Sequence, residues 1–361
     1  MARHHSRPHR AGRPGADHAR NAALPAFGWK VPAPLLASPQ SPGMETRMMR
    51  WLLALLLACG TLPAQAEWPD RPLTIIVPFG PGGGGDVAAR SIARWMEPRL
   101  GQPVVVVNRP GAGGEIGFAA TRRAAPDGYT IGVVTLPNLV TIPIERRAQY
   151  AVDDLEPVAN LVDDIGGIFV RADSRFRNLA DLLQQARGNP GGVSFGTTGV
   201  GSYAHFGMLA LERLAGVSLT AVSYGGTAAM RSALVQGGLL VAGLSMADAA
   251  EEMQSGLFRP LGQMAAERWA GAPMVPTLRE QGFDIRYSSM RGFAAPAGTP
   301  PSVIRQLSQL MGEATRDPDY RRVAESQAMP LRFLDHKAFA AEIARQQAEY
   351  SRIWRESPWR E

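Results

Sequence analysis

Residues 73–86 read LTIIVPFGPGGGGD, so that a five-residue apolar run leads directly into a glycine-rich loop. Residues 104–115, VVVVNRPGAGGE, repeat this order, and apolar periodicity typical of a helix follows each loop, at 87–100 and at 116–125. A buried strand, a glycine loop and a helix in this order expose backbone N–H groups at a helix N-terminus, where a carboxylate or a phosphate is favoured. We therefore expect the two loops to hold one anion between them.

The same alternation continues along the chain and predicts an α/β protein with a largely parallel sheet. The predicted strands are 73–77, 104–107, 130–135, 167–171, 193–195, 219–223, 239–244 and 291–295. The predicted helices are 87–99, 116–124, 178–187, 203–215, 227–236, 302–315, 318–327 and 336–353. Ligands of such sheets bind beyond the carboxyl ends of the strands, which is where the glycine loops lie.

Residues 1–66 differ from the rest and are expected to be a disordered extension followed by a signal peptide. Residues 1–47 are rich in Arg, His, Pro and Ser and lack apolar periodicity. An apolar core at 51–58, too short to span a bilayer stably, precedes a small-x-small site that ends at Ala66. We predict export and cleavage after Ala66. A start of translation at Met44, Met48 or Met49 fits this leader best, and a true cytosolic extension is the alternative.

Cysteine and charge place limits on the mature part. Cys59 is the one cysteine of the sequence, so residues 67–361 form no disulfide and no Cys metal site. The residues before Cys59 also resemble a lipoprotein site, which makes lipid anchoring there a minor alternative to a free periplasmic protein. Residues 1–66 hold 8 of the 38 basic and 2 of the 32 acidic residues, which leaves 30 of each. A net charge of zero gives no reason to expect a nucleic-acid partner.

The motifs of several enzyme classes are missing from residues 67–361. The Gly82–Gly85 run has no lysine for a phosphate-binding loop, and Pro81 fits a dinucleotide fingerprint poorly. His205 and His336 are far apart in sequence, which supports neither a zinc site nor a Ser-His-Asp triad. We therefore expect no metal, no cofactor and no catalytic residues.

Seven motifs occur in order along residues 67–361. They are Trp68-Pro69; Pro78-Phe79 with its glycines and Asp86; Asn108-Arg109-Pro110-Gly111-Ala112-Gly113-Gly114; Pro126-Asp127-Gly128-Tyr129-Thr130; Gly199-Val200-Gly201-Ser202; Pro276-Thr277 with Glu280 and Gly282; and Ala295-Pro296-Ala297-Gly298-Thr299-Pro300. Together they resemble the Bug family, the extracytoplasmic solute receptors of tripartite tricarboxylate transporters.

The resemblance implies a type II periplasmic-binding-protein fold, with two α/β lobes and a ligand cleft between them. Lobe one would comprise residues 67–166 and 290–361, and lobe two residues 167–289. Such a receptor captures a small organic carboxylate, closes around it and delivers it to the membrane permease subunits of the transporter. It is expected to be a monomer. The alternatives are a receptor that signals to a sensor kinase and an exported enzyme that uses Asp86 or Glu115 as a base.

The resemblance also implies which residues meet the ligand. In lobe one the backbone amides of two loops would grip one carboxylate, with Phe79 shaping the wall; these loops comprise Gly82, Gly83, Gly84, Gly85, Asp86, Ala112, Gly113, Gly114 and Glu115. Lobe two would contribute Thr197, Thr198, Gly199, Ser202, His205, Tyr224, Gly225, Gly226 and Thr227. For Asp86, a helix cap is as good an interpretation as ligand selection. Ser202 and Thr198 fit helix capping equally well, and His205 fits a buried core histidine.

Two positions depart from the family pattern. Gly85 stands where relatives often carry Thr or Ser, and Tyr224-Gly225-Gly226 lacks the cation of the usual Tyr-Lys-Gly or Tyr-Arg-Gly. We therefore expect a more permissive pocket, or a ligand with a less charged distal group. Arg231, Arg286 and Arg291 are the candidates to compensate for the missing cation.

Overall fold

The computed structural model describes residues 43–44, 47–49 and 68–359. The chain divides into two units, Met1–Ala64 and Gln65–Glu361, and the second carries the fold. The predicted signal-peptide core at 51–58, the cleavage site after Ala66 and Cys59 lie outside the described residues.

Ten described strands form one mixed sheet, in the order β2-β1-β3-β9-β4-β7-β5-β6, with β10 and β8 pairing to β4. Their bounds are β1 Leu73–Val77, β2 Val104–Asn108, β3 Thr130–Leu136, β4 Leu155–Arg171, β5 Ser194–Thr197, β6 Thr220–Ser223, β7 Val241–Ser245, β8 Phe258–Gln263, β9 Ser288–Pro296 and β10 Leu331–Leu334.

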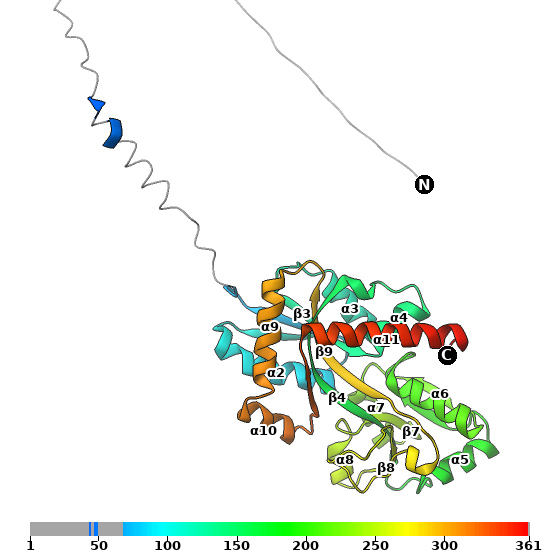
Figure 1. Cartoon of the computed structure of the whole chain (residues 1–361). Coiled ribbons are helices and arrows are strands. Elements are labelled where there is room, and N and C mark those ends of the chain that lie inside the picture. The colour runs from blue at the N-terminus through cyan, green and yellow to red at the C-terminus, as the bar shows by residue number, and fades with distance from the viewer. Residues whose placement is uncertain (1–42, 45–46, 50–67, 360–361) are drawn as a thin grey trace, which may run out of the picture. The chain divides into compact units, whose positions relative to one another are not determined.

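The sheet contains two parallel groups joined by antiparallel strands. Strands β2, β1 and β3 are parallel, as are β7, β5 and β6. Strand β4 pairs antiparallel with β9 as far as Ile165 and then, from Gly166, with β7. The long strands β4 and β9 therefore run from one group toward the other (Figure 1). The prediction of a largely parallel sheet is wrong for this centre, because every pair that β4 or β9 makes is antiparallel.

Helices pack around both groups (Figure 1). Their bounds are α2 Gly84–Leu100, α3 Glu115–Arg122, α4 Asn138–Glu145, α5 Leu179–Gly188, α6 Tyr203–Ala215, α7 Thr227–Val235, α8 Ala250–Gln254, α9 Pro301–Ala314, α10 Pro318–Ser326 and α11 His336–Glu356, with short 3₁₀ turns η1 Ala112–Gly114, η2 Val152–Asp154 and η3 Arg279–Gln281. All eight predicted helices are confirmed to within a few residues at each end.

Four elements of the structure have no clear signal in the sequence, for identifiable reasons. Strand β8 carries Pro260 and Gly262, which are unfavourable in strands, and β10 has only four residues. Helix α4 contains Pro143 and a run of β-branched residues, and α8 is a five-residue helix. The predicted strand 167–171 proved to be the end of the 17-residue strand β4.

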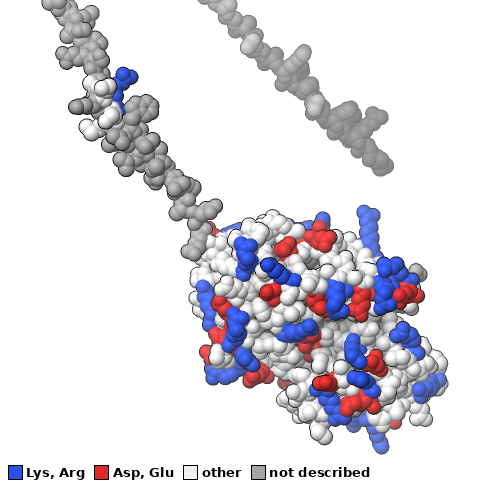
Figure 2. Space-filling view, viewed as in Figure 1, with Lys and Arg blue, Asp and Glu red and all other residues white. Residues whose placement is uncertain are grey.

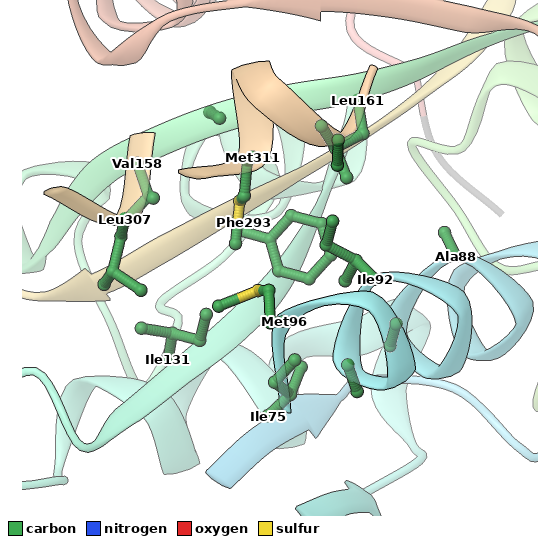
Figure 3. Close-up of a cluster of buried hydrophobic side chains, with 14 of the residues drawn as sticks. Ile75, Ala88, Ile92, Met96, Ile131, Val158, Leu161, Phe293, Leu307 and Met311 are labelled. Carbon is green, nitrogen blue, oxygen red and sulfur yellow. The ribbon is translucent and has the colours of Figure 1, made fainter. Parts of the chain in front are cut away.

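The core beneath the first group is centred on Phe293 of β9, which is fully buried. Ile92 and Met96 of α2 and Met311 of α9 contact this core from the helices (Figure 3). At about 25 cal/mol per Å² of buried apolar area, such packing is the main force that fixes α2 against the sheet. The N-terminus of α2 is thereby held at the carboxyl end of β1.

The face seen in Figure 2 shows no large area of one charge. Figure 2 shows Lys and Arg interspersed with Asp and Glu over the visible face. Within the described part of the chain, no helix combines the length and the apolar character needed to cross a bilayer.

Candidate functional site

A first cavity lies where loops of the two strand groups meet, with about 400 Å³ of atom-free space including its open mouth. Its lining residues come from both groups and from β9: Phe79, Gly83, Gly84, Gly85, Thr135, Asn138, Thr198, Tyr203, Thr227, Asp248, Ser289 and Arg291. The predicted residues Phe79, Gly83, Gly84, Gly85, Thr198 and Thr227 are thus brought together.

The N-terminus of α2 forms one wall of this cavity. Gly83 is the N-cap and provides no side-chain cap. Among the described residues, none accepts a hydrogen bond from the N–H groups of Gly83, Gly84 or Gly85. These donors stand at the positive end of a 17-residue helix, so the wall favours an anionic ligand group.

A second cavity, with about 890 Å³ of atom-free space including open solvent, is lined by the other glycine loop. Four successive residues, Gly111 to Gly114, have positive φ, and Ala112 is one of them at φ 50°. A non-glycine residue in this region is strained, and such strain is common at binding sites. Asn138 Nδ2 donates to Gly113 O at 3.0 Å and Arg146 Nη2 donates to Ala112 O at 3.1 Å, which holds the loop.

Phe79 and Thr198 line both cavities. The Phe79 ring lies beside Gly114, where an added Cβ would be 3.3 Å from Cζ. The two predicted glycine loops therefore border adjacent spaces separated by one aromatic ring. That the two loops hold a single anion stays a prediction.

Asp86 is buried beside the first loop and lines neither of these cavities. Its carboxylate accepts hydrogen bonds from Gly82 N at 3.0 Å, Asn108 Nδ2 at 2.9 Å and Arg90 Nε at 3.0 and 3.1 Å. Burial raises the pKa of Asp86, but the donors, led by Arg90, outweigh it and lower the pKa overall. These contacts favour the capping interpretation, because they fix the Gly82 turn at the start of α2.

Glu115 is also buried and engaged. Its carboxylate accepts from Arg146 Nε at 3.1 Å and from Gln149 N at 2.9 Å. Arg146 itself lines the second cavity. Glu115 thus positions Arg146 beside the η1 loop and lies outside the lining of both cavities.

The predicted polar residues after β5 serve different purposes. Thr197 Oγ1 accepts from Gly199 N at 3.2 Å, and Ser202 Oγ accepts from His205 N at 3.3 Å as the N-cap of α6. His205 is 1% exposed, and its Nδ1 accepts from Gly201 N at 3.3 Å. Burial lowers the pKa of His205 to about 4. Of this group, Thr198 and Gly199 line a cavity.

The loop after β6 meets the loop after β1 directly. Gly80 N donates to Gly225 O at 3.2 Å, and a Cβ on Gly226 would lie 3.4 Å from Gly80 N. Tyr224 and Gly225 line the second cavity. Gly225 stands where the usual family motif has Lys or Arg. An added Cβ there would have nothing within 4 Å, so the space beside Gly225 is open.

Arg291, one of the three arginines considered above, is buried and lines the first cavity. Its Nη2 lies 3.0 Å from Asp164 Oδ2, 3.1 Å from Asp248 Oδ1 and 3.0 Å from Ser245 Oγ. Burial raises the pKa of Asp164 to about 6, since the attraction of Arg291 only partly offsets desolvation and the repulsion of Asp248. Arg286 pairs instead with Asp284 on the surface.

Five lining residues were not selected from the sequence: Thr135, Asn138, Tyr203, Asp248 and Ser289. Asp248 and Thr135 carried a usable signal, because each is a polar residue at or just beyond the end of an apolar strand. In the described residues, no cluster of three or more His, Cys, Asp or Glu is arranged to hold a metal.

A family model described as the tripartite tricarboxylate transporter family receptor matches residues 88–357. The UPF0065 protein in the tcbD-tcbE intergenic region of Pseudomonas sp. (strain P51) is 36% identical over 279 residues, covering 75% of this chain and 82% of that protein. BugT of Bordetella pertussis is 34% identical over 277 residues, covering 74% and 84%.

Solved structures of periplasmic binding proteins are also similar to this chain. The periplasmic binding protein BugD is 28% identical, covers 80% of this chain and 98% of its own, and superposes with a TM-score of 0.75. A Rhodopseudomonas palustris protein with adipate is 25% identical, covers 80% of this chain and 98% of its own, and has a TM-score of 0.76. MatC from the same organism, with bound malate, is 26% identical, covers 79% of this chain and 99% of its own, and has a TM-score of 0.74.

The fold is therefore that of the two-lobed periplasmic binding proteins, and the protein is a solute-binding receptor rather than an enzyme. The chain belongs to the tripartite tricarboxylate transporter receptor family, as the motifs indicated.

Proposed function

We propose that this protein is a periplasmic receptor that captures a small organic carboxylate between two lobes, 67–166 with 290–361 and 167–289. The proposal includes delivery of that carboxylate to the membrane permease subunits of a tripartite tricarboxylate transporter. The observation that carries it is the first cavity, where free N–H groups at the start of α2 face lining residues from both strand groups. Relatives with bound adipate and malate support the same ligand class.

Contacts across the cleft support capture by closure. Besides the Gly80–Gly225 bond, Thr141 Oγ1 donates to Gly201 O at 2.9 Å and Arg231 Nη2 donates to Gly82 O at 3.3 Å. Each of these bonds joins a loop or helix of the first group to a loop or helix of the second. A ligand that touches both sides favours this closed arrangement, because it binds that state better than an open one.

The test is native mass spectrometry of the full chain before and after unfolding, together with thermal-shift measurements on mono-, di- and tricarboxylates. A released acid, or stabilisation by one class of acid, supports the proposal. No released acid and no shift with any of them would contradict it. Small-angle X-ray scattering at saturating ligand then tests closure, which predicts a smaller radius of gyration.

A further inference from the structure

Two residues that line the first cavity each carry a buried side-chain oxygen that has no hydrogen-bond partner among the described residues. These oxygens are Asp248 Oδ2 and Thr135 Oγ1, and the two residues are 9% and 5% exposed. Asp248 follows β7 and Thr135 lies in β3, so they approach the cavity from different strand groups. Buried polar atoms in folded proteins are almost always hydrogen-bonded to protein or to ordered water, so both oxygens can accept a hydrogen bond from a group that binds in the cavity.

The charges around Asp248 leave a negative surplus. Arg291 faces two carboxylates, Asp164 and Asp248, so the buried group has one formal positive and two formal negative charges. Arg231 does not supply the missing cation, because its Nη1 donates to the backbone oxygen of Asp248 at 2.9 Å and lies 3.5 Å from Glu252 Oε1. A cationic group is therefore favoured at Asp248, and a second carboxylate is disfavoured there.

The anion-binding and cation-binding walls are close together. A Cβ on Gly84 would lie 2.4 Å from Asp248 Oδ1, so the Asp248 carboxylate packs against the first turn of α2. A ligand carboxylate at the free N–H groups of Gly83 to Gly85 would thus have its neighbouring substituent within reach of Asp248. This spacing suits a carboxylate and an ammonium group on the same or adjacent carbons.

We propose that the first cavity binds an amino acid as its zwitterion, with the carboxylate at the N-terminus of α2 and the ammonium group at Asp248 Oδ2 and Thr135 Oγ1. This inference rests on the proposed carboxylate-binding function and narrows its ligand class. In this arrangement Asp248 is the residue that makes the cavity select amino acids over carboxylic acids of the same shape that lack the amino group.

The test compares matched probes by isothermal titration calorimetry with the full chain. Each set differs at one substituent: aspartate, malate and succinate; glutamate, 2-hydroxyglutarate and glutarate; alanine, lactate and propionate. We expect the amino member of at least one set to bind about tenfold or more tighter than its hydroxy and unsubstituted analogues. Asp248→Asn should reduce that preference to near unity.

Folding of the variant is not at risk from unpaired charge, because Asp248→Asn leaves Arg291 and Asp164 as a one-to-one pair. Asp284→Asn, at an exposed ion pair, is the matched control and should retain the wild-type preference. Binding of acids without preference for the amino member, or a preference that survives Asp248→Asn, overturns the inference and leaves the proposed function intact. Failure of every acid to bind overturns the proposed function, and the inference with it.

Discussion

The guanidinium group of Arg291 occupies the space that a side chain at Gly84 would need. A Cβ at Gly84 would lie 2.2 Å from Arg291 Cζ and 2.3 Å from Nη1. Gly84 is the first residue of α2 and bears one of its free N–H groups, whereas Arg291 lies in β9 and forms ion pairs with two aspartates. The first turn of α2 and the buried charge cluster are therefore in direct contact, so that a side chain at Gly84 would displace the cluster.

Gly84→Ala should weaken carboxylate binding by about tenfold or more, because the methyl group displaces Arg291 from the first turn of α2. The control is Gly188→Ala at the end of α5, where nothing lies within 4 Å of an added Cβ. Calorimetry with the acid that gives the largest thermal shift measures the effect, and circular dichroism checks folding. Equal affinities for the two variants would show that the contact has no influence on the site.

Arg291→Met should lower the free energy of unfolding by about 3–5 kcal/mol, because it leaves Asp164 and Asp248 buried without a counter-ion. Urea denaturation measures the loss. Adding Asp164→Asn and Asp248→Asn to the same chain should restore most of it, since the uncompensated charges are then gone. The exposed Arg286→Met change should leave stability near the wild-type value, and a similar loss there would argue against the charge mechanism.

Asp164 should make the protein less stable as pH rises. Its pKa is about 6 in the folded state against 3.8 for the ordinary side chain, so between these values the folded state holds more protons than the unfolded state. Stability from this group therefore falls from about pH 4 to about pH 6 and is constant above. Urea denaturation of wild type and Asp164→Asn across this range should show the variant gaining stability relative to wild type, and parallel curves would contradict the assignment.

The parts of the fold that could be predicted are those in which local sequence and tertiary environment agree. Strand β1 is a continuous apolar run and is buried, and α2 has apolar periodicity and packs on the core. The first half of β4 contains Pro157, Asp163 and Asp164, and no local pattern indicates a strand. It forms because β9 pairs along almost its whole length, a partner more than a hundred residues away in sequence.

The site follows the same division. Glycine loops can be recognised from sequence because the conformation of the loop itself requires glycine, and residues of both loops line the cavities. The ion pair of Asp248 and Arg291 could not be predicted from the sequence. Asp248 follows β7 and Arg291 lies in β9, so only the tertiary fold brings them together. The role in ligand selection considered for Asp86 passes to Asp248 in our proposal, since Asp86 is occupied by three donors.

Asp86→Asn separates these two aspartates by experiment. The variant should lose about 1–3 kcal/mol of stability, because an amide cannot accept from Gly82, Arg90 and Asn108 together. It should leave the ratio of affinities for glutamate and glutarate unchanged, unlike Asp248→Asn. A fall in that ratio would show that Asp86 contributes to ligand selection.

His205 should oppose Asp164 in its effect on acid stability. Its pKa is about 4 in the folded state against 6.5 for ordinary histidine, so between these values the unfolded state holds more protons. This group's contribution is complete above about pH 6.5 and is lost as pH falls toward 4, by up to about 3 kcal/mol.

His205→Asn keeps an acceptor for Gly201 N but cannot take up the proton, so its stability relative to wild type should rise as pH falls from 6.5 to 4. The two pH windows overlap with opposite slopes, so these two contributions partly cancel in the wild-type curve. Urea denaturation of wild type, His205→Asn, Asp164→Asn and the double variant resolves them. If the His205→Asn curve instead runs parallel to wild type, then His205 takes up its proton in the folded state as readily as in the unfolded chain.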